Sequence, residues 1–303
     1  MLSRSEIDIL SHHVKENTQN LLKLFASTPE PVVFFLAGCL PGEAVLHQKQ
    51  LTLFGMICRL PGNILHTIAH NILTLAKQTE KSWFSQVRSL CYVYNLPHPL
   101  RLLREPPPKE QYKRLVKNNI ADYWQSKLRA HSATLSSLKF FKPQFMSLQR
   151  PHPMWSSAAT SYHVNKCVVT ARMLSGRYRC GSLLRHFSPA CSGLCELCGE
   201  EQEDLAHILL PRCSLLQERK EFLVQFARDR LAIFPSAITI FERRLLSPET
   251  DNFLQFLLDP SAVPEMIIAT QSQPEILSSV FRVTTTWCYA MHRTRLKLLG
   301  KWT

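Results

Sequence analysis

Four residues of the metal-ligand types lie within one short stretch of this chain and restrict how that stretch can fold. Cys195 and Cys198 are separated by two residues, and His207 and Cys213 follow within the next fifteen. Two thiolates on a tight turn can bind one edge of a tetrahedral metal ion, and Gly199 permits the turn that the second ligand needs. The spacing therefore predicts a small metal-binding module.

The last two ligands need an element of their own. A short helix over 205–211 would present His207, and Pro211 would end that helix so that the chain turns back with Cys213. Thiolate and imidazole ligands in an intracellular setting favour Zn²⁺ as the metal. Four protein ligands leave no position for water, so we expect a structural zinc that contributes folding energy and no catalysis.

Two alternatives to this ligand set remain open. Cys191 precedes the first ligand by four residues and could replace Cys195 or Cys198 in a looser turn. The cluster could also stay reduced and bind no metal. The other cysteines are scattered among apolar residues, which is typical of buried thiols.

Helical spacing of apolar residues recurs along the chain and predicts an all-α fold. The 303 residues are 45% hydrophobic and include 19 prolines but only 9 glycines, which favours Pro-bounded helices over a sheet with tight glycine turns. We expect helices over 5–25, 42–58, 64–76, 82–94, 109–131, 162–174, 214–230 and 274–299. Residues 139–160 are expected to form an ordered crossing segment. The prediction is a multi-helix domain with a small Cys-Cys-His-Cys zinc module and a C-terminal helix.

Positive charge is concentrated in the middle of the chain. The net charge is +13, and residues 101–190 hold 16 Lys and Arg but only 3 Asp and Glu. Such an excess attracts a polyanion, and released counterions add salt-dependent affinity. RNA or DNA is therefore the expected partner. The predicted phosphate contacts are Lys113, Arg114, Lys117, Lys127, Arg172, Arg177 and Arg179.

Two other charge patterns affect this prediction. The acidic residues Glu200, Glu201, Glu203 and Asp204 lie inside the metal module and argue against phosphate binding there. The C-terminal helix has one apolar face, and Arg282, Arg293, Arg295 and Lys297 are expected to make its other faces basic. We therefore expect the basic segment before the module to contact nucleic acid.

The chain start lacks the pattern of a secretory signal, and no hydrophobic run is long enough to span a membrane. We expect an intracellular protein, nuclear or cytoplasmic, with no membrane partner.

Several segments resemble the C-terminal region of non-LTR (LINE-type) retrotransposon reverse transcriptases, and together they cover nearly the whole chain. They are LPGEAVLHQKQLTLFGMICRLP at 40–61, SWFSQVRSLCYVYNLPHPL at 82–100, FFKPQFMSL at 140–148, ARMLSGRYR at 171–179, EDLAHILLPRC at 203–213 and TWCYAMHRTRLKLLGKW at 286–302.

The resemblance implies a helical thumb or connector followed by a zinc module that helps to hold template RNA or target DNA. It implies Cys195, Cys198, His207 and Cys213 as ligands, although many relatives have one residue fewer between the last two. The expected regions are a thumb/connector-like part at 1–100, a basic helical part at 101–190, the zinc module at 191–214 and a C-terminal helical part at 215–303.

The catalytic part of such an enzyme is missing from this sequence. A polymerase palm needs a Phe/Tyr-x-Asp-Asp motif and a further aspartate, because carboxylates hold two Mg²⁺ ions at the transferring phosphate. The six aspartates of this chain include no adjacent pair, and an endonuclease domain has no room. We therefore expect no enzymatic activity, and the polymerase region of a parent element is a conceivable partner.

The leading hypothesis is a noncatalytic, zinc-containing nucleic-acid-binding module. The alternative is an all-α protein-interaction module in which a structural zinc supports the fold and the basic face binds no nucleic acid.

Overall fold

The computed structural model describes residues 3–75, 82–188, 190–210 and 212–301, and across them the prediction of an all-α fold is confirmed. The α-helices are α1 (Arg4–Leu21), α2 (Glu30–Ala37), α3 (Gly42–Cys58), α4 (Ile64–Leu75), α5 (Trp83–Val93), α6 (Pro99–Arg104), α7 (Lys109–Ala133), α8 (Ser161–Leu174), α9 (Gly181–Arg185), α10 (Leu205–Leu209), α11 (Gln217–Leu231), α12 (Pro235–Leu245), α13 (Thr250–Leu258), α14 (Pro264–Ser272) and α15 (Glu275–Leu298). Within the described ranges, none of these helices has both the length and the apolar character needed to cross a membrane. The residue predicted to end α4, Ala76, lies outside the described ranges.

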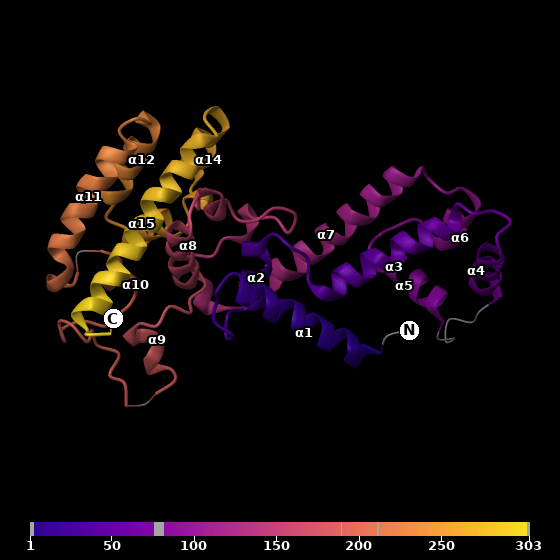
Figure 1. Cartoon of the computed structure of the whole chain (residues 1–303), viewed down its shortest axis with the longest axis horizontal. Helices are drawn as coiled ribbons and strands as arrows, with labels where there is room; N and C mark the ends of the chain where they lie inside the picture. The colour runs from indigo at the N-terminus through magenta and orange to yellow at the C-terminus, as the bar shows by residue number, and fades with distance from the viewer. Residues whose placement is uncertain (1–2, 76–81, 189, 211, 302–303) are drawn as a thin grey trace.

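Helices α1–α7 form an N-terminal helical group at one end of the long axis of the molecule (Figure 1). Within this group, α3 packs against both α7 and α1. Tyr112, Val116 and Ile120 recur every four residues on α7 and are buried. The Tyr112 hydroxyl donates a hydrogen bond to the Leu51 carbonyl oxygen (3.2 Å), which ties α7 to α3. The basic helix is therefore anchored through its apolar face.

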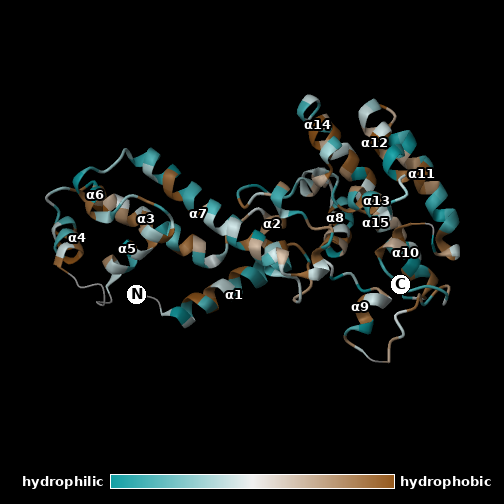
Figure 2. Cartoon of the chain, turned by 180° about the vertical axis from the view of Figure 1, so that it is seen from behind, coloured by the Kyte–Doolittle hydropathy of each residue, from teal (hydrophilic) through white to brown (hydrophobic). Residues whose placement is uncertain are grey.

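Helices α8–α15 form a C-terminal helical group around α15, which contacts α8, α10, α11, α13 and α14. The apolar side of α15 includes Phe281, Trp287 and Met291, all fully buried. The Trp287 indole donates to the Leu209 carbonyl oxygen at 3.1 Å. Figure 2 shows hydrophobic residues in this interior and a largely hydrophilic α11 outside it. Since α10 carries a predicted metal ligand, α15 is the support behind that site.

The segment between α7 and α8 joins the two groups, and the prediction that it is an ordered crossing segment is confirmed. It contains the 3-10 turns η1 (Ser136–Leu138), η2 (Pro143–Phe145) and η3 (Pro153–Ser157) and buries Phe141, Met146, Leu148 and Met154. The Leu36 carbonyl oxygen accepts hydrogen bonds from the His152 backbone N–H (3.1 Å) and the Trp155 indole (2.9 Å). The crossing segment is thus fixed to the end of α2.

Gly38 ends α2 in a left-handed conformation directly against the crossing segment. Its φ is +64°, and an added Cβ would lie 2.0 Å from the carbonyl carbon of Arg150. We expect Gly38→Ala to lower the free energy of unfolding by about 2–3 kcal/mol, because both backbone strain and a backbone clash must be relieved. Urea unfolding would measure the loss. Gly62→Ala is the matched control. Gly62 also has a positive φ (+85°) but has open space around it, so the free energy of unfolding should fall by only about 1 kcal/mol. Equal losses of stability in the two variants would show that the backbone clash does not contribute.

Candidate metal centre

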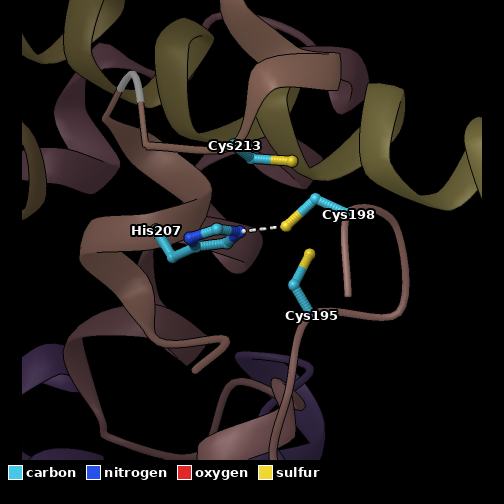
Figure 3. Close-up of side chains that lie close together, drawn as sticks. All are labelled: Cys195, Cys198, His207 and Cys213. Atoms are coloured by element: carbon cyan, nitrogen blue, oxygen red, sulfur yellow. Dashed lines mark hydrogen bonds between the residues drawn. The ribbon is translucent and has the colours of Figure 1, made fainter. Parts of the chain in front are cut away.

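The structure brings together the four residues that the sequence spacing singled out, and this cluster could hold a metal ion. The ligand atoms of Cys195, Cys198, His207 and Cys213 all lie within 4.8 Å of one another. Figure 3 shows the two cysteines of the first loop facing the imidazole, with Cys213 approaching from the segment after α10. Residues separated by up to 18 positions in the sequence thus converge on one point.

The first two ligands lie on a turn that the backbone fixes. The Cys195 N–H donates to the Glu201 carbonyl oxygen (2.8 Å), and the Gly199 N–H donates to the Cys195 carbonyl oxygen (2.8 Å). Gly199 has a φ of +69°, the left-handed conformation expected from the sequence. An isolated antiparallel bridge between Leu194 and Gln202 closes the base of the loop.

The third ligand is oriented by two carboxylates. Asp204 caps α10, accepting a hydrogen bond from the His207 backbone N–H (2.7 Å). The Nδ1 atom of His207 lies 3.3 Å from Glu201 Oε2. A proton shared with this carboxylate leaves the Nε2 lone pair for a metal, and carboxylates commonly orient ligating histidines in this way. His207 is buried, so its ring has little freedom to leave this position.

One pair of candidate ligand atoms has a separation that suits tetrahedral coordination. The Cys198 Sγ lies 3.4 Å from His207 Nε2. Zinc–sulfur and zinc–nitrogen bonds of about 2.3 and 2.0 Å at a tetrahedral angle would separate these two atoms by about 3.5 Å. Four protein ligands make a closed site with no position for a substrate. The donor set and this separation therefore fit a metal ion held by four protein ligands.

The protonation of the thiols also depends on their surroundings. Burial raises the pKa of the Cys213 thiol to about 12. Burial acts in the same direction on Cys198, but hydrogen bonds from the backbone at Glu200 and Glu201 and with the side chains of Cys195 and His207 together lower the pKa of that thiol to about 7. A bound dication would stabilise the thiolate form of every cysteine in the cluster.

Cys191 lies outside the four-residue cluster. Its sulfur is 3.9 Å from the Gly181 carbonyl oxygen. In the described part of the chain, the group with metal-site geometry includes Cys195 and Cys198 and does not include Cys191. The residue predicted to end the helix of His207, Pro211, is not among the described residues. The helix itself ends at Leu209.

A buried ion pair supports the metal loop from behind, and sequence reasoning missed it. Both Glu203 oxygens accept hydrogen bonds from the Arg295 guanidinium, at 2.6 and 2.7 Å, and both side chains are buried. Glu203 Oε2 also accepts from the Gly181 N–H (2.7 Å), and Oε1 lies 3.9 Å from the Cys195 sulfur. The prediction that Arg295 belongs to an exposed basic face of α15 is therefore wrong. The apolar spacing of Phe281, Cys288 and Met291 reaches position 295 and could have revealed this.

Four of the predicted nucleic-acid contacts lie on α7. Lys113, Arg114, Lys117 and Lys127 are exposed, on the helix whose apolar face packs against α3. Lys113 is 3.4 Å from Glu110, and the Lys127 ammonium lies 4.1 Å from the ring centroid of Trp124. This group of four cations is thus on the surface. Whether it contacts nucleic acid stays a prediction.

The other three lie at and beyond the end of α8. Arg172 donates two hydrogen bonds to the Lys23 carbonyl oxygen (3.0 and 2.6 Å), so it links the two helical groups and is only partly exposed. Arg179 is exposed, and both guanidiniums approach the ring of Phe25. Arg177 is partly buried and lines a cavity. The structure therefore divides the seven cations into a helical row and a group at the junction.

His292 on α15 gives a pH dependence to the stability of this support. Its Nδ1 lies 2.8 Å from the Tyr178 hydroxyl, and burial, with Arg295 and Arg172 nearby, lowers its pKa to about 4. The unfolded chain then binds the extra proton between pH 6.5 and 4, so the free energy of unfolding should fall by about 2 kcal/mol as the pH drops through this window.

Urea unfolding at pH 7 and pH 5 would measure this effect. His292→Gln retains a hydrogen-bonding group but cannot gain the proton, so it should show a smaller pH dependence than the parent protein. An unchanged pH dependence in the variant would assign the effect to other groups.

The fold and the cluster together define an all-α protein with a candidate metal centre of three cysteines and one histidine. No family model, curated protein or solved structure matches this chain. The identity of the metal and of any partner must therefore be inferred from the chemistry of the residues themselves.

Proposed function

We propose that this chain is a noncatalytic nucleic-acid-binding module with a structural zinc ion. It would correspond to the C-terminal region of a LINE-type reverse transcriptase without the polymerase palm and the endonuclease. The zinc would hold the loop of Cys195 and Cys198 against α10, and so stabilise the C-terminal helical group. Its four ligands leave no site for catalysis.

The observation that carries the proposal is the exposed cationic row on α7. Lys113, Arg114 and Lys117 lie close together on the surface of a helix fixed through its opposite face. Residues 101–190 include 16 cationic residues and only 3 acidic ones, so ion pairs within this segment cannot neutralise its charge. A phosphate backbone is the common polyanion that such a row would bind with salt-dependent affinity.

Charge reversal tests the proposal. The triple variant Lys113→Glu, Arg114→Glu and Lys117→Glu should weaken binding of a single-stranded RNA or DNA by at least about tenfold. It should also flatten the dependence of log K on log salt by about 2, since three phosphate contacts are lost. Fluorescence anisotropy at several salt concentrations would measure both effects.

The control carries the same charge change elsewhere. Arg219, Arg230 and Lys297 are exposed on α11 and α15, and their reversal to Glu should cost much less affinity. Equal losses in both triple variants would show a general effect of net charge. A parent protein that binds neither RNA nor DNA at low salt would refute the proposal.

A second candidate function is favoured by exposed apolar side chains on α3 and α4. Leu53, Met56, Ile64 and Leu65 are 47–73% exposed on these helices of the N-terminal helical group. Several large apolar residues on neighbouring helices are typical of a protein-binding surface. An all-α interaction module would use this surface for another protein or for the polymerase region of a parent element. It would bind no nucleic acid, so the salt titration separates the two candidates.

A further inference from the structure

A cavity of about 710 Å³ lies beside the metal module, and the cluster of metal ligands does not use it. Its walls come from the segment after α7, the end of α8, and α9, α10 and α13. The volume falls in the range of small-ligand pockets. The cavity thus lies between the crossing segment and the C-terminal helical group.

The apolar part of the lining would suit a flat ring. Met173, Leu205 and Leu254 supply aliphatic surface, and two aromatic residues join them. Phe140 is partly buried, whereas Phe187 is 68% exposed although it lines the cavity. An exposed phenylalanine at the edge of a cavity is a surface on which a nucleobase can stack.

The lining carries charges of both signs. Lys139, Arg177 and His186 line the cavity together with two aspartates. Asp251 forms an ion pair with Lys139 (2.6 Å), and Asp204 caps α10. Both carboxylates therefore have a partner in the structure.

Arg177 is the group that most clearly lacks a partner. Its Nε is buried, and no acceptor lies within hydrogen-bonding distance in the described part of the chain. The Nε thus has no acceptor among the described residues, and the side chain lines the cavity, where a ligand can meet the guanidinium. The planar guanidinium matches phosphate oxygens in particular.

We infer that this cavity binds one nucleotide unit, with the base against Phe187 and the apolar lining and the phosphate at Arg177. The inference rests on the proposed function, since the unit is taken to be an unpaired nucleotide of a bound strand. A free mononucleotide offers the same chemistry. A duplex does not, because its bases are stacked and paired, so the cavity would favour single-stranded over double-stranded nucleic acid.

Four variants of the full-length protein test the cavity. Phe187→Ala should weaken binding of a single-stranded 12-mer by about 5- to 100-fold, because one stacking contact is lost. Phe222→Ala is the matched control, since Phe222 on α11 is 58% exposed and away from the cavity, and it should bind as the parent does. Arg177→Gln should also weaken binding. The Lys113, Arg114 and Lys117 triple reversal should weaken strand binding but leave binding of AMP unchanged.

Calorimetric titration with AMP and with inorganic phosphate distinguishes the possible ligands of the cavity. It also shows whether a negative result refutes the cavity inference or the proposed function. Strand binding that depends on α7 but is unaffected by Phe187→Ala and Arg177→Gln would overturn the cavity inference and leave the proposed function intact. AMP binding that needs Arg177, without any strand binding, would refute the proposed function and assign the cavity to a free mononucleotide. Inorganic phosphate binding as tightly as AMP would reduce the site to an anion site and overturn the inference.

Discussion

Replacing Cys198 by serine should release about one equivalent of zinc per chain and destabilise the C-terminal helical group. Cys198 supplies one of four converging ligand atoms, with its sulfur 3.4 Å from His207 Nε2. Removing a residue that only orients a ligand weakens metal binding by about 10- to 100-fold. Removing a ligand itself should therefore weaken zinc binding by at least about 100-fold. Because zinc binding and folding are coupled, stability should fall with it.

The choice of Cys198 separates loss of the metal from loss of packing. Its side chain is only partly buried, in contrast to the fully buried Cys213, so serine itself disturbs the core little. Metal analysis of the purified protein and thermal unfolding with and without a chelator would measure the two effects. Zinc absent from a folded parent protein would refute the site.

Cys191→Ser is the matched control. This cysteine is close in sequence and also partly buried, but its sulfur contacts the Gly181 carbonyl oxygen outside the cluster. It should keep zinc at the parent level. Zinc lost from this variant and retained by Cys198→Ser would make Cys191 the ligand in place of Cys198.

The second large effect is expected at the buried ion pair behind the metal loop. Arg295→Met should lower the free energy of unfolding by about 3–5 kcal/mol, because it leaves the Glu203 carboxylate buried without its counter-charge. The adjacent Cys195 would lose a fixed neighbour, so zinc binding should weaken by about 10- to 100-fold as well. Urea unfolding and competition with a zinc indicator would measure the two losses.

Two further variants make this prediction specific. Arg282→Met removes an exposed guanidinium from the same helix and should change stability by no more than about 0.5 kcal/mol. Adding Glu203→Gln to Arg295→Met removes the uncompensated charge, so the double variant should lose less than the sum of the single losses. A loss below about 1 kcal/mol for Arg295→Met would show that the pair contributes little.

Sequence reasoning predicted the local elements well because their signals are local. The bounds of α3 agree with the prediction residue for residue, and Ser82 caps α5 as a serine at that position should. Short helices such as α6 and α14 were missed, since a few apolar residues next to a proline do not establish a period. Phe222 is one of the apolar residues of α11 but is exposed, because the packing of a helix buries only part of its apolar stripe.

Apolar periodicity and ligand spacing act over a few turns of chain, so they were enough to predict the all-α class and the four-residue metal cluster. Which charges are free depends on contacts between distant segments. Arg295 and Glu203 are 92 positions apart, and Arg172 meets a carbonyl oxygen 149 positions away. Spacing rules carry no information over such separations. The cavity at Arg177 has the same origin, because its walls meet only when the crossing segment packs against the C-terminal helical group.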